Sequence, residues 1–261
     1  MINSKTLYKI ELLKLIKRKD IWVLFLIIGI PIFYSIGVYT NSTIITYESS
    51  EKEYALNFVV SMFEFCYMVF IFLFILSLNT ARTFAGEIDD KSILLFLPRI
   101  NNRKKIYFCK KNAIITIFSL ISLIFIIVTL LLYYLLVVKR TDIATNIFYI
   151  KDELIYLIAR FISIYLVYIF VIGLSMCLSP FFKQISVVIF TAIVLVINMY
   201  MQHFPIIKYL SPTYYASEVF NFKGDNKFLL ILLFGSILIT TFYNIIFDVI
   251  GIKKFIRKDI S

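Results

Sequence analysis

The sequence predicts an all-α polytopic membrane protein, with six transmembrane helices that follow an N-terminal amphipathic helix at the membrane surface. Of its 261 residues, 61% are hydrophobic and 16% are charged, whereas soluble domains have about 45–50% apolar and about 25% charged residues. The apolar residues form charge-free runs at 21–47, 65–81, 112–138, 161–182, 184–207 and 228–247. All but the second reach the roughly 18 residues with which a helix crosses hydrocarbon, and the second does so once 58–64 is added.

The same pattern excludes several classes of protein. The runs are continuous and do not alternate, which excludes a β-barrel, and such hydrophobicity excludes a disordered chain. No connection between runs is longer than about 35 residues, too short for a soluble domain. We therefore expect residues 1–261 to form a single transmembrane domain, without an ATPase or receptor module.

The N-terminal segment 1–20 is predicted to lie in the plane of the lipid headgroups. Within 4–17, apolar side chains recur at helical spacing between lysines, as in basic interfacial helices. These apolar residues are Leu7, Ile10, Leu13 and Ile16. The alternative is a basic leader that only sets orientation. A cleaved signal peptide is disfavoured because the next apolar run is too long and no small-residue cleavage site follows it.

The transmembrane helices are expected at 21–39, 56–79, 112–138, 156–179, 184–202 and 228–250. Pro31 lies inside the first of these, where it predicts a kink. The fourth is expected to stop at Ser179-Pro180, and Lys183 marks a short turn before the fifth.

The basic residues predict the orientation of the bundle. The two termini, the 79–111 connection and the turn near Lys183 together hold 19 of the 27 lysine and arginine residues, whereas the other connections hold 7. Because cytoplasmic segments are enriched in lysine and arginine, both termini are expected in the cytoplasm. The net charge of +11 therefore reflects membrane topology, and no basic soluble domain is available to bind nucleic acid.

The connection at 79–111 is predicted to carry a short exposed helix. Asp89 or Asp90 can cap it, and Pro98 ends it. Its apolar faces come from Ile93, Leu94, Phe96 and Leu97. An exposed helix with apolar tips between two membrane helices favours docking to a partner. The alternative is a helix that rests on lipid headgroups.

This segment resembles the hallmark of type-two ABC transporter permeases. In that family a glutamate precedes a small or hydroxyl residue, leucines, a proline and basic residues that lead into the third membrane helix. The matching positions here are Glu87, Ser92, Leu94, Leu95, Pro98, Arg99, Arg103 and Lys110. Lys91-Ser92 stands where relatives usually have Gly-Thr. The resemblance extends in architecture to the whole chain, and in motif to about 30 residues.

The resemblance implies a bacterial permease subunit without its own motor. Residues 87–98 would form the coupling helix, with Glu87, Asp89, Asp90, Leu94, Leu95, Pro98 and Arg99 on or beside the surface that faces the ATPase. Leu94 and Leu95 would fill a pocket of that partner, and Glu87 and Arg99 would pair with charges at its rim. The implied complex contains two ATPase subunits and a second permease, identical or homologous.

No residue pattern in the chain itself points to catalysis or to a bound cofactor. None of the seven glycines begins a phosphate-binding G-x-x-x-x-G-K-[ST] loop. We therefore expect ATP and magnesium only in the partner ATPase. The single histidine, His203, has no cysteine nearby with which to hold a structural metal.

Two charged residues lie within predicted spans near the outer side. Glu64 lies inside the second span, where an ionised side chain costs about 2.5–3.5 kcal/mol. Arg160, in the fourth span, is the expected partner. The pair can be a structural clamp or part of a transport path, and Glu64 can alternatively extend to the interface.

The outer segment 203–227 is rich in aromatic residues. It is expected either as an ordinary aromatic-belt loop or, as the resemblance implies, as short re-entrant helices that close the outer mouth. The candidate gate residues are Tyr209, Pro212, Tyr214 and Tyr215.

The function that these features predict is export of an apolar or amphipathic substrate, such as a peptide, an antimicrobial or a lipid-like molecule, through the bacterial cell membrane. Short outer connections offer no site for a binding protein, which favours export over uptake. The alternative is an ATP-independent secondary transporter or a membrane assembly factor. A secondary transporter normally shows acids or broken helices at mid-bilayer in related halves, and only Glu64 approaches that pattern.

Overall fold

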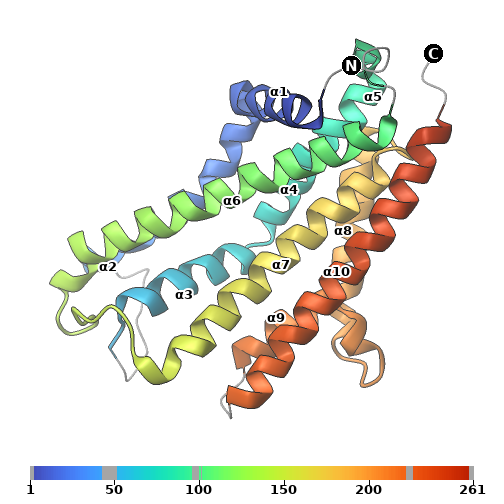
Figure 1. The fold of residues 1–261 in the computed structure, drawn as a ribbon. Helices are drawn as coiled ribbons and strands as arrows, with labels where there is room; N and C mark the ends of the chain where they lie inside the picture. Colours follow the sequence, from blue (N-terminus) through green and yellow to red (C-terminus); the bar gives the residue numbers. More distant parts are fainter. Residues whose placement is uncertain (1–2, 43–51, 96–99, 101, 222–225, 259–261) are drawn as a thin grey trace.

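The computed structural model is all-α and describes residues 3–42, 52–95, 100, 102–221 and 226–258 (Figure 1). Long helices run side by side, and both described chain ends lie at the same end of the bundle as α1 and α5. That end is called the terminal end below. The main helices are α1 (Ser4–Lys17), α2 (Leu26–Tyr39), α3 (Ala55–Met68), α4 (Ile71–Ala81), α5 (Glu87–Asp89), α6 (Arg103–Leu135), α7 (Leu154–Leu178), α8 (Gln184–Met201), α9 (Pro212–Asn221) and α10 (Asn226–Arg257).

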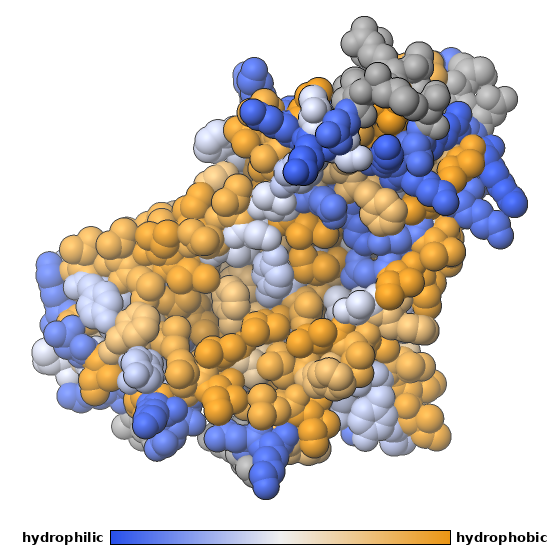
Figure 2. Space-filling view, in the orientation of Figure 1, coloured by the Kyte–Doolittle hydropathy of each residue, from blue (hydrophilic) through white to orange (hydrophobic). Residues whose placement is uncertain are grey.

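Six helical segments of the described chain are long and apolar enough to cross a membrane, as the sequence predicts. They are Lys19–Tyr39, Ile71–Asp89, Arg103–Lys139, Lys151–Leu178, Gln184–Met201 and Asn226–Arg257. Figure 2 shows a broad apolar band across the middle of the visible face, with hydrophilic side chains gathered at its two ends. This is the surface of a multi-pass membrane protein, because only side chains outside the hydrocarbon need water.

The second predicted span, 56–79, is wrong as one continuous helix. It is divided into α3 and α4 at Phe70, whose φ of 57° is left-handed. No proline or glycine marks this position. Both pieces contact α7, but α3 also contacts α2 and α6, whereas α4 also contacts α8. Packing on two sets of partners thus redirects the chain where the local sequence would allow one helix.

The third predicted helix begins earlier than expected: α6 starts at Arg103, whereas the predicted start was residue 112. The side chain of Asn102 accepts a hydrogen bond of 2.9 Å from the backbone N–H of Lys104, which is the N-cap interaction that starts a helix. The basic run 103–111 is therefore helical. As a consequence, Lys110 and Lys111 project from a rigid helix into the protein, where the sequence suggested a loop.

The first span also differs in detail from its prediction. Residues Lys19–Phe25 form a 3₁₀-helix, and α2 then continues through Pro31 without ending. In α1, the buried side chains are Leu7, Glu11 and Leu15, whereas Ile10, Leu13 and Ile16 are exposed. The predicted apolar stripe of α1 is thus divided: Leu7 packs into the bundle and the other three side chains face outward, where lipid can cover them.

A close approach of α10 to its neighbours depends on Gly251. A Cβ at this position would lie 2.8 Å from the hydroxyl oxygen of Tyr107 and 3.1 Å from Cα of Cys177. We therefore expect Gly251→Ala to lower the free energy of unfolding by about 2 kcal/mol, because overpacking a filled contact forces backbone shifts.

The matched control for this substitution is Gly29→Ala in α2. There a Cβ would meet only a ring carbon of Phe33 at 3.8 Å, and alanine is the better helix former. Gly29→Ala should leave stability unchanged or raise it. The measurement is the apparent melting temperature of the detergent-solubilised protein, and equal shifts for the two variants would contradict this account of Gly251.

Candidate functional site

A buried ion-pair cluster at the terminal end joins α1, α5 and α6. The side chain of Lys110 is fully buried, and its Nζ lies 2.9 Å from Oε2 of Glu11 and 2.6 Å from Oε2 of Glu87. Lys14 reaches the other carboxylate oxygen of Glu87 at 2.5 Å. We call Glu11, Lys14, Glu87 and Lys110 the charge quartet.

The quartet is electrically balanced, with two ammonium groups and two carboxylates. Removing charges from water costs several kcal/mol per ion, and this cost is offset only when partners and geometry are good. Short charge-assisted hydrogen bonds meet that condition for Lys110 and Glu87, whereas Oε1 of Glu11 has no hydrogen-bond partner among the described residues. The quartet therefore fixes the position of α5 relative to α1 and α6.

The expectation that Glu87 pairs with charges at the rim of a partner is contradicted by this arrangement. Its side chain is 9% exposed and both of its carboxylate oxygens bind lysines of this chain. The reason is that α6 begins at Arg103 and carries Lys110 inward on a helix. Glu87 is thus the internal anchor of the segment that was expected to present it outward.

The tip beyond Glu87 is the exposed part of this connection. Asp89 and Asp90 are exposed, Ile93 is buried and Leu94 is partly buried. Leu95 is the last residue of a 3₁₀ turn, Ser92–Leu95, and its side chain lies outside the described part of the structure. Pro98 and Arg99 lie outside the described residues. The prediction that Asp89 or Asp90 caps the start of a helix is wrong. Instead α5 ends at Asp89, because Lys91 adopts a left-handed φ of 56°.

Further polar contacts tie the same end of the bundle together. Lys111 binds Asp248 of α10 at 2.6 Å. Arg103 donates to the backbone carbonyls of Phe255, Ile256 and Lys258, at 3.0, 3.1 and 2.8 Å. A cation at the C-terminus of a helix satisfies its last carbonyls and opposes the helix dipole. The start of α6 is therefore locked to the end of α10.

A second buried ion pair lies nearer the opposite end of the bundle, between Glu64 of α3 and Arg160 of α7. The structure brings together the two charges that were expected to meet, and their side chains are 6% and 9% exposed. The guanidinium also stacks over the ring of Phe220 in α9, 4.7 Å from its centroid. Arg160 therefore joins three helices that are distant in the sequence.

The aromatic segment near the same end contains a 3₁₀ turn, Ile207–Leu210, followed by α9. Pro212 begins α9, a position that suits its fixed φ. Pro212 and Tyr214 are buried, whereas Tyr209 is exposed. Tyr215 donates a 3.0 Å hydrogen bond to the backbone carbonyl of Tyr209. The four predicted gate residues thus form one structured unit, which packs on α7, α8 and α10.

Hydrogen bonding and burial raise the pKa of two side chains near this end of the bundle, Lys208 and Tyr54. Nζ of Lys208 lies 5.1 Å from the ring centroid of Tyr209 and 5.0 Å from that of Tyr214. A hydrogen bond with Tyr214 raises the pKa of Lys208, which keeps the ammonium charged. Burial raises the pKa of Tyr54, and a hydrogen bond to Glu153 raises it further.

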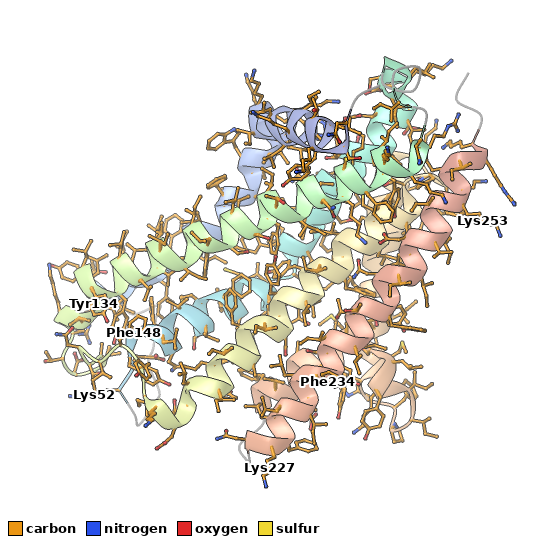
Figure 3. The ribbon with its side chains drawn as sticks, in the orientation of Figure 1. Lys52, Tyr134, Phe148, Lys227, Phe234 and Lys253 are labelled. Carbon is orange, nitrogen blue, oxygen red and sulfur yellow. The ribbon has the colours of Figure 1, made fainter. Side chains whose placement is uncertain are left out.

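The connection after α6 packs against the segment before α3. The backbone N–H of Glu53 donates to the carbonyl of Ile143 at 2.8 Å, and that of Thr145 donates to the carbonyl of Glu53 at 2.9 Å. Tyr133 donates to the carbonyl of Glu53 at 2.8 Å. Lys52, Tyr134 and Phe148 lie together at this end, away from the chain termini (Figure 3). These contacts link the non-terminal ends of α3 and α6.

The charge quartet was largely missed by sequence reasoning, although two signals could have indicated it. Glu11 is the one acidic residue among the first 19 residues, and it shares an i, i+4 face with Leu7 and Leu15. Lys110 directly precedes a charge-free run with Lys111. An acid on the buried face of a basic helix requires a cationic partner. Within the described residues, no group of three potential metal ligands is present.

One protein family has a model that matches residues 21–261, under the description "Protein of unknown function (DUF2705)". No curated protein and no solved structure matches the chain. The match covers α2 to α10 and therefore includes every predicted span. It also includes the Glu64–Arg160 pair and two members of the charge quartet, Glu87 and Lys110, whereas Glu11 and Lys14 precede it. The chain is thus a multi-pass membrane protein that belongs to the DUF2705 family.

Proposed function

We propose that this chain is the transmembrane subunit of an ATP-driven exporter, with ATP and magnesium bound by a separate ATPase subunit. The observation that carries the proposal is the anchored tip at the terminal end. The tip runs from Glu87, at the end of the second span, to Leu95, and the charge quartet holds its base while Asp89 and Asp90 remain exposed.

This arrangement suits the transmission of force. Coupling between a motor and a membrane domain needs a docked element with discrete positions, because a flexible linker would absorb the movement. A displacement of the tip would act on Glu87, and through Lys14 and Lys110 on α1 and α6. The resemblance to type-two ABC permeases supports the same role for this connection.

The orientation and stoichiometry follow from the proposed role. ATP is cytoplasmic, so the terminal end, which carries most of the basic residues, would face the cytoplasm. Two permease subunits, identical or related, would pair with two ATPase subunits in the bacterial cell membrane. The substrate would be apolar or amphipathic, as for a peptide, an antimicrobial or a lipid-like molecule, and it would leave past Tyr209, Pro212, Tyr214 and Tyr215.

The test is the double variant Leu94→Ser/Leu95→Ser. A buried apolar hot-spot residue contributes about 2 kcal/mol or more to an interface, so the variant should lose most of the ATPase that co-purifies with the wild-type protein. It should still insert, because neither residue lies in a candidate span. Affinity purification from native membranes, with ATP turnover assayed on the eluate, measures both effects.

The matched control is Leu135→Ser/Leu136→Ser, two adjacent leucines at the other end of α6, of which Leu135 is 61% exposed. It should retain the ATPase. Unchanged co-purification and turnover in the Leu94/Leu95 variant would overturn the proposal. Transport by the purified chain alone, without ATP, would support a secondary transporter in its place.

A further inference from the structure

We propose that a groove between α6 and α10 at the terminal end binds one anionic phospholipid, with the headgroup phosphate between Lys104 and Lys253 and an acyl chain along the apolar wall below. This inference concerns a resident lipid and is independent of the proposed export function.

The groove has a volume of about 680 Å³. Lys104 and Phe108 line it from α6, and Val249, Ile252 and Lys253 line it from α10. Each lysine lies four residues from an apolar lining residue on its own helix, and therefore one turn away on the same face. Because the two helices are antiparallel, both ammonium groups lie at the terminal end and both apolar residues lie deeper.

The charge at the mouth of the groove is positive. Asp248 also lines the groove, but it is paired with Lys111 at 2.6 Å. Among the residues that the structure describes, neither Lys104 nor Lys253 forms an ion pair with a carboxylate. Figure 3 labels Lys253 near the C-terminal end of α10. A neighbouring hollow of about 400 Å³, which shares Lys104 and Phe108, adds Lys5 and Lys105.

The groove continues toward the middle of the bundle, where Asn112, Thr240 and Asn244 join apolar side chains in the lining. A further hollow of about 270 Å³ shares Phe108 and Asp248 with the groove and extends to Leu166, Ile169 and Thr241. From Lys253 to Thr241, α10 rises about 18 Å at 1.5 Å per residue. One leaflet of a bilayer with a hydrocarbon core of about 30 Å has a similar depth. The groove thus has the length of a lipid tail and carries its cations at headgroup level.

The charges favour a phospholipid over a second copy of this chain. In a two-fold contact the same patch meets itself, so Lys104 and Lys253 of two copies would face each other, and like charges at an interface oppose association. An anionic headgroup instead complements the patch, as in other basic pockets between transmembrane helices. Val249, 62% exposed on the wall, would contact the acyl chain.

The test is native mass spectrometry of the detergent-solubilised protein titrated with dioleoylphosphatidylglycerol or dioleoylphosphatidylcholine. We expect the wild type to retain phosphatidylglycerol in preference to phosphatidylcholine. Lys104→Gln/Lys253→Gln should weaken phosphatidylglycerol binding by about tenfold or more, because each lysine near an anionic headgroup contributes. Val249→Trp should weaken it as well, by filling the groove without changing charge.

Two matched controls should bind like the wild type. Lys9→Gln/Lys17→Gln removes the same charge from exposed positions of α1, and Ile231→Trp adds the same bulk at an exposed position of α10. Equal affinity of the wild type for the two lipids, or unchanged phosphatidylglycerol binding in both groove variants, would overturn the proposal. A dimer of the wild type in the same spectra would also overturn the proposal if the groove variants lost that dimer regardless of lipid, because the groove would then hold a second copy of the chain.

Discussion

Replacing Lys110 with methionine is expected to lower the free energy of unfolding by about 3–5 kcal/mol. The ammonium group has no exposure and binds both Glu11 and Glu87. Removing one partner of a buried ionic group leaves uncompensated charge, and this loss exceeds the loss of packing because methionine fills a similar volume. The measurement is the apparent melting temperature, followed by size-exclusion chromatography of the heated protein.

The rescue of this variant separates charge from packing. In the Lys110→Met background, Glu11→Gln removes the carboxylate that lost its cation, whereas Glu87 retains Lys14 at 2.5 Å. The double variant should therefore be more stable than Lys110→Met alone. Lys105→Met, at an exposed position of the same helix, is the control and should have little effect. If Lys105→Met and Lys110→Met destabilise the protein equally, the quartet does not hold the terminal end together.

Substituting either Glu64 or Arg160, and so breaking their ion pair, is expected to lower the free energy of unfolding by about 3 kcal/mol. Both side chains are almost completely buried, so Glu64→Gln would leave a guanidinium, and Arg160→Met a carboxylate, without its ionic partner. The Arg160 variant should show the larger loss, because it also removes the contact with Phe220 that holds α9. A chromatographic melting assay of both single variants measures the losses.

The double variant, Glu64→Gln/Arg160→Met, provides the decisive comparison. Its loss should be clearly smaller than the sum of the two single losses, because each substitution removes the same interaction. Asp152→Ala changes an exposed carboxylate at the same end and should be nearly neutral. Strictly additive losses in the cycle would show that Glu64 and Arg160 do not interact in the folded protein.

The membrane-spanning segments could be predicted because hydrophobic insertion depends on local composition. The runs at 112–138 and 184–207 contain no charge, and an apolar run of this length satisfies its backbone in lipid only as a helix. α6 and α8 accordingly include most of these runs. The start of α6 was missed because its N-cap, Asn102, lies within a basic stretch that carries no hydropathy signal.

The candidate sites were only partly predictable. Glu64 and Arg160 were expected to meet because each is costly alone within a span. Nothing in the sequence indicated that Phe220 would lie over the guanidinium. Glu87 was expected at the rim of a partner, but its direction depends on Lys110, which is 23 residues away in the chain.

The sequence by itself determined that this protein spans the membrane with apolar helices and has a strongly basic set of connections, since both properties depend on which residues are adjacent in the chain. Only the tertiary structure decided the break at Phe70 and the inward direction of Glu87. The partners that fix these features come from distant segments: Lys110 meets Glu11 across 99 residues. A buried charge adopts the direction in which its counter-charge lies, and that direction exists only once the helices have packed.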